Sequence, residues 1–110
     1  MTVHSKAIRH ELRQLAGRAH EEELRRALLT LANHFDAWKA GELDSFDLSD
    51  QIHAFHNGAS RVLYNRYTGG MHEVTVASAL ARGILTPDDI SPETLVVLAR
   101  QIALLEADDS

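Results

Sequence analysis

Two histidines, His53 and His56, stand three residues apart in the segment QIHAFHNGASRVLYNRY. In a helix this spacing places both imidazole rings on one face, where they can bind a single divalent ion. Asp50 lies one turn before His53 and can add a carboxylate oxygen. Helical bundles usually complete such a site from facing helices, and His34 and His72 can supply those ligands. The pair therefore suggests a divalent transition-metal site as one hypothesis, although no Glu-x-x-His pair accompanies it.

The stretch HAFHNGAS also resembles the segment around the phosphorylated residue of histidine-phosphotransfer domains, which are acidic four-helix bundles. In that family an apolar residue lies two positions after the histidine, and a lysine and a glycine lie three and four positions after it. From His53, Phe55 matches the apolar position. His56 replaces the lysine, and Gly58 comes one residue late. The family is therefore not assigned; the resemblance implies only that His53 would be the phosphorylated residue.

The preferred interpretation is that this face of the helix is covered by another surface. Advancing 100° per residue gathers a band of aromatic, histidine and serine side chains beside the core face of the helix. Rings that are apolar in the body and polar at the tip suit a surface that is partly covered and partly wet. We expect this band to pack against a neighbouring helix or another chain. Its members are Phe46, His53, His56, Ser60, Tyr64 and Tyr67.

Helical periodicity dominates the first 40 residues. Apolar residues at a spacing of three or four predict a helix over about 4–16, with Ile8, Leu12 and Leu15 on its core face. The stripe loses phase around Gly17 and restarts at Leu24. This break predicts a second helix over about 20–39, although one long helix bent at Gly17 is the open alternative. The restarted stripe consists of Leu24, Ala27, Leu28, Leu31, Phe35 and Trp38, which we expect to be core residues.

A third helix follows a short link and ends near Tyr67. Gly41 can end the preceding helix in the left-handed conformation, and Asp44 can cap the next one. So short a connection makes the two helices antiparallel neighbours. The predicted core face of the third helix consists of Leu48, Ile52, Phe55, Ala59 and Val62.

The last third of the chain predicts two more helices. One runs from Met71 to Gly83, and the other spans about 92–107, after a single turn at TPDD. Residues 105–110 are expected to form a frayed acidic tail. No segment has the alternation of a strand. The fold class is therefore predicted as all-α: one domain, residues 1–110, folded as a compact bundle of four to five helices, largely antiparallel and without a β-sheet.

The last predicted helix is apolar on most of its sides. Leu95, Leu98 and Ile102 form a core stripe, yet Val97 and Leu104 lie outside it. A helix that is apolar on most sides is usually buried on most sides. We therefore expect a second contact surface at Val97 and Leu104, most simply in a two-fold homodimer.

Composition excludes several classes of function. The chain has no cysteine, which excludes disulfides and thiolate metal sites. Its net charge of −5 argues against a nucleic-acid surface. Its apolar runs are too short to span a bilayer, and its start lacks a secretory signal, so a cytoplasmic location is expected. No nucleophile elbow or phosphate loop appears. We predict a non-enzymatic oligomeric interaction or regulatory module without a cofactor, with a possible further protein partner.

Overall fold

The computed structural model describes the backbone of residues 5–108 and the side chains as far as Leu104. All regular structure within these residues is helical and none of them forms a strand, which confirms the all-α prediction. α2, the π-helical turn η1 and α3 follow one another without a break. The elements are α1 (Lys6–Lys39), α2 (Ser45–Phe55), η1 (His56–Ser60), α3 (Arg61–Tyr67), α4 (His72–Ala81), the 3₁₀ turn η2 (Pro87–Asp89) and α5 (Pro92–Asp108).

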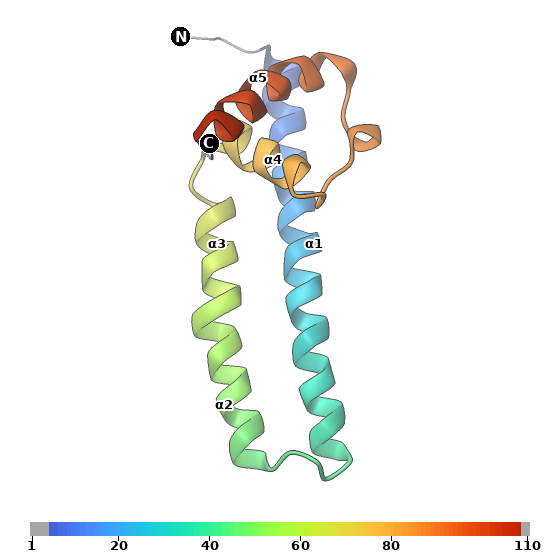
Figure 1. The fold of residues 1–110 in the computed structure, drawn as a ribbon, viewed down its shortest axis with the longest axis vertical. Helices are drawn as coiled ribbons and strands as arrows, with labels where there is room; N and C mark the ends of the chain where they lie inside the picture. The colour runs from blue at the N-terminus through green and yellow to red at the C-terminus, as the bar shows by residue number, and fades with distance from the viewer. Residues whose placement is uncertain (1–4, 109–110) are drawn as a thin grey trace.

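The molecule is elongated, with a head and an arm (Figure 1). The head consists of the first half of α1, the end of α3, and α4, η2 and α5. The arm consists of residues 24–39 of α1 with α2 and η1, which run alongside them as a hairpin. The principal extents are 55 × 29 × 22 Å, and the radius of gyration is 17.5 Å. A compact chain of this length would have a radius of gyration of about 13 Å. The predicted compact bundle is therefore wrong for a single copy.

α1 is one continuous helix through Gly17, so the prediction of separate helices at 4–16 and 20–39 is wrong. Its first turn is capped by the Ser5 hydroxyl, which accepts a hydrogen bond from the backbone N–H of Ile8 at 3.1 Å. The apolar stripe changes phase because α1 changes its neighbours. Its first half packs in the head, and its second half packs against α2 and η1 (Figure 1).

The tip of the arm forms as the sequence predicts. Gly41 has φ of +79°, and the backbone N–H of Glu42 reaches back to the carbonyl of Ala37, so α1 ends in the left-handed cap. Asp44 then caps α2, because its carboxylate accepts a hydrogen bond from the backbone N–H of Asp47 at 2.8 Å. The short link fixes α2 antiparallel to the second half of α1.

The π-helical turn η1 shifts the buried face of the third helix by one residue. A π turn holds one residue more than an α turn, so every later side chain moves about 100° around the axis. Before η1, Leu48 is buried as predicted. After it, Leu63 is buried, whereas the predicted core residue Val62 is half exposed. The core face predicted from a constant period is therefore correct at Leu48 and wrong after η1, and Ile52, which lies before η1, is also exposed.

α4 and α5 pack around the first half of α1 and form the core of the head. The backbone N–H and the hydroxyl of Ser91 donate hydrogen bonds to the Glu11 carboxylate at 2.9 and 2.6 Å, and the buried Thr94 hydroxyl donates a third. These contacts attach the start of α5 to α1. The buried apolar residues of the head are Leu12, Leu15, Ala16, Ala19, Leu63, Tyr67, Val76, Ala77, Ala79, Leu85, Ile90 and Leu98.

α5 continues to Asp108, so residues 105–108 are helical rather than a frayed tail. The remaining two residues of the predicted tail, 109–110, lie outside the described residues.

Candidate functional site

The second half of α1 presents an apolar face that the rest of the chain leaves open. Leu28 is 45% exposed and Phe35 36% exposed, although both belong to the stripe predicted to form core. One facing helix covers only one side of α1 along the arm. The open face comprises Leu24, Leu28, Leu29, Ala32 and Phe35. The first four of these line a shallow depression of about 310 Å³ together with Glu21 and Arg25.

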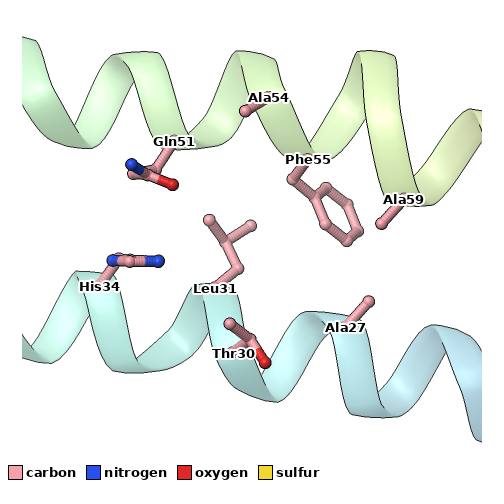
Figure 2. A pocket seen from close by; sticks show the side chains of 8 residues that line it. All are labelled: Ala27, Thr30, Leu31, His34, Gln51, Ala54, Phe55 and Ala59. Carbon is pink, nitrogen blue, oxygen red and sulfur yellow. The ribbon is translucent and has the colours of Figure 1, made fainter.

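A second depression, of about 210 Å³, lies between α1 and α2 (Figure 2). Leu31 and Phe55 point toward each other across the gap, and His34 faces Gln51 near the tip. Alanine and threonine line the rest, so their short side chains leave the two helices incompletely packed. The lining residues are Ala27, Thr30, Leu31, His34, Gln51, Ala54, Phe55 and Ala59.

Trp38 closes the apolar stripe near the tip and is 38% exposed rather than buried. Its indole N–H donates a hydrogen bond to the Ser45 hydroxyl at 3.0 Å, which ties the end of α1 to the start of α2. The indole is therefore held in place while part of its ring stays open to solvent. A rigid, half-exposed tryptophan is a residue type that concentrates binding energy at interfaces.

The predicted aromatic and histidine band is only partly assembled. Phe46 is 84% exposed at the tip of the arm, Tyr64 is 61% exposed, and both His53 and His56 are exposed. Tyr67 is 5% exposed and does not belong to this surface. The physical reason is the π turn, which rotates Tyr67 toward the head. Its assignment to the interaction surface is therefore corrected.

Tyr67 instead belongs to a charged network at the base of the arm. Its ring stacks on His20 with a centroid separation of 5.1 Å, and its hydroxyl donates a hydrogen bond to Glu23. Arg66 forms an ion pair with the same carboxylate at 3.0 Å, and Arg82 forms another. One carboxylate on α1 thus holds side chains from α3 and from the residue that follows α4.

This network sets the pKa of Glu23 below its usual value. Burial raises the pKa, but hydrogen bonds from Arg82, Tyr67 and Arg66 and the positive charge of Arg82 outweigh it. Burial and the hydrogen bond to the Glu23 carboxylate raise the pKa of Tyr67. The arrangement joins α1 to α3 and to the end of α4.

The candidate metal ligands are distributed over both parts of the molecule. His53, His56 and Asp50 lie on the arm and are exposed, and none of them lines the depression that His34 borders. His72 lies in the head at the start of α4, where its buried Nδ1 makes no hydrogen bond to the described residues. Among these residues, no three histidine, aspartate or glutamate side chains are close enough to hold one ion. The metal site stays a hypothesis on the sequence alone.

The predicted second surface on α5 is partly open. Leu104 is 58% exposed, and Val96, which the same apolar pattern includes, is more exposed still. Val97 is half-buried. The head therefore carries scattered apolar side chains, whereas the arm carries a continuous row.

Comparison with protein-family models, with curated proteins and with solved structures finds no match for this chain. Within residues 5–108, no helix is long and apolar enough to cross a membrane. The open face of α1 is the feature that the sequence patterns did not indicate, because Leu24, Leu28 and Phe35 were assigned to the core and Leu29 and Ala32 to no surface. One signal in the sequence nevertheless pointed to this open face. The apolar stripe continues to Trp38, but only one predicted helix, the third, runs beside that part of the chain and could cover it.

Proposed function

We propose that this protein is a non-enzymatic helical interaction module that self-associates through the open face of its arm, with a regulatory or adaptor role. The carrying observation is the row of apolar side chains along α1 from Leu24 to Phe35, in which Leu28, Leu29 and Phe35 are exposed. Exposed apolar rows of this kind mark contact surfaces in soluble proteins.

The architecture of the arm supports the same proposal. A helix hairpin extending from a head buries little of its own surface, and most helical stability in proteins comes from packing an apolar face. Two such hairpins placed face to face make a four-helix bundle, in which the apolar side of each α1 is covered. Burying the exposed part of a leucine or phenylalanine stabilises such a pair by roughly 1 kcal/mol per side chain.

A pair of matched variants tests the proposal. Leu28→Asp places a charge in the open face of the arm, and Leu104→Asp places the same charge on the exposed side of α5. We expect wild-type protein and Leu104→Asp to sediment as dimers at tens of micromolar, and Leu28→Asp to sediment as a monomer with unchanged helical circular dichroism. A monomeric wild-type protein at these concentrations would overturn the proposal. If Leu104→Asp were monomeric while Leu28→Asp remained a dimer, the contact would lie on the head and not on the arm.

A further inference from the structure

Four charged residues border the open face of α1 in alternating order. Toward the tip of the arm they are Glu21, Arg25, Asp36 and Lys39. All four side chains are exposed, and none forms an ion pair within the described part of the chain. Their spacing places them on the same side of the helix as Leu28 and Ala32. The apolar centre of the face is therefore flanked by opposite charges at each end.

This order is complementary to itself when one helix is reversed. Glu21 and Lys39 are eighteen residues apart, about 27 Å along the axis. Their midpoint is Thr30, and the midpoint of Arg25 and Asp36 lies between Thr30 and Leu31. A two-fold axis that crosses the open face level with Thr30 would thus set each glutamate near a partner lysine and each arginine near a partner aspartate.

The apolar residues fit the same register. Around that axis Leu28 lies opposite Ala32 of the second copy, so a large side chain meets a small one. Leu24 lies within one residue of the position opposite Phe35, so two large apolar side chains come close together at each end of the contact. A parallel arrangement in register would instead place each charge beside its like, which is unfavourable. Isologous two-fold contacts of this kind are the most common in protein dimers.

We infer that the occupant of the open face is a second copy of this chain, with its arm antiparallel and the two α1 helices crossing at the level of Thr30. The inference rests on the proposed self-association. It adds the relative orientation of the two copies and the ion pairs between them. The tip of each arm then lies near the head of the other copy, and the pairs Glu21–Lys39 and Arg25–Asp36 each occur twice.

Charge reversal tests the pairs. Lys39→Glu sets two glutamates against each other at both ends of the dimer, and we expect its dissociation constant to rise about tenfold at low salt. Glu21→Lys is expected to act similarly. The double variant Glu21→Lys/Lys39→Glu restores opposite charges and is expected to return to within about twofold of wild type. Lys6→Glu, the same reversal at an exposed site on the head part of α1, serves as the control. Additive weakening in the double variant would overturn the inference.

Cysteine cross-linking tests the orientation separately, because the chain has no cysteine of its own. Glu21→Cys and Lys39→Cys proteins are mixed, oxidised and digested, and the disulfide-linked peptides are identified by mass spectrometry. An antiparallel contact is expected to give chiefly the mixed disulfide. Chiefly self-linked products from a protein that sediments as a dimer would overturn the orientation and leave self-association standing. A protein that sediments as a monomer would overturn both.

Discussion

Glu23 is the side chain that the polar groups at the base of the arm contact. Its carboxylate accepts hydrogen bonds from Tyr67 and Arg66 of α3 and from Arg82, just beyond α4. The Glu23 side chain is only 11% exposed, so little water is available to replace these donors. A charge that is largely removed from solvent stabilises the fold only while its partners remain in place. Glu23 therefore fixes the arm to the head through polar contacts.

We expect Glu23→Gln to lower the free energy of unfolding at pH 7 by about 1–3 kcal/mol, because hydrogen bonds to a charged group are lost. The pKa of Glu23 is lowered in the folded protein, so its contribution is present above the unfolded-state pKa of about 4.3. The contribution disappears as pH falls through the lower folded-state pKa. Urea unfolding between pH 3 and pH 7 measures the difference. Glu22→Gln, which removes an exposed pair with Arg26, is the control, and an equal loss in both variants would contradict the prediction.

At the scale of elements, η1 decides which side of the third helix meets the head. Leu63 is 7% exposed and lies in the head cluster, whereas its neighbour Val62 is 52% exposed. We expect Leu63→Ala to destabilise the protein by about 2–4 kcal/mol and Val62→Ala by less than about 1 kcal/mol. Thermal or urea unfolding of the monomeric Leu28→Asp background measures this without a contribution from association. The reverse order would indicate an uninterrupted α-helix through residues 56–60.

The ends of the elements were predictable because local chemistry determines them. The left-handed Gly41, the cap at Asp44 and the turn after Gly83 each need only a few neighbouring residues. The π turn was not predictable, since nothing in the spacing around Gly58 distinguishes it from a regular helix. The contact of Glu11 with Ser91 joins residues 80 positions apart, and no period in the sequence indicates such a pair.

The candidate site was predictable only in part. The exposed Phe46 and Tyr64 follow from helical periodicity, but the open face of α1 does not. Its apolar stripe is the same whether the covering surface comes from this chain or from another copy. The number of neighbours around α1 depends on where α4 and α5 fold, and they fold around its other half (Figure 1). Which half of α1 is covered by α4 and α5 is therefore determined by the tertiary structure and not by the local sequence pattern.

At the scale of the whole molecule, the head and the arm are stabilised differently. The head encloses fully buried residues such as Leu98 and Val76. In the arm beyond the head, Leu48 is the one buried apolar side chain, and the depression beside Phe55 leaves the hairpin incompletely packed. Local opening costs least where few apolar contacts are lost, so the arm is the part of the molecule that opens first.

Self-association should therefore stabilise the arm alone, and this predicts a regional dependence on concentration. A partner that binds the folded arm shifts its opening equilibrium by mass action. We expect backbone amides of residues 27–37 and 48–59 to exchange with deuterium more slowly as protein concentration rises from about 1 µM to 100 µM. Amides of α4 and of residues 8–16, which lie away from the proposed contact, should exchange at unchanged rates. Hydrogen exchange followed by mass spectrometry measures both regions in one sample. Leu28→Asp should remove the dependence in the arm, whereas Leu104→Asp should keep it. A concentration effect confined to α5 would contradict association through the arm.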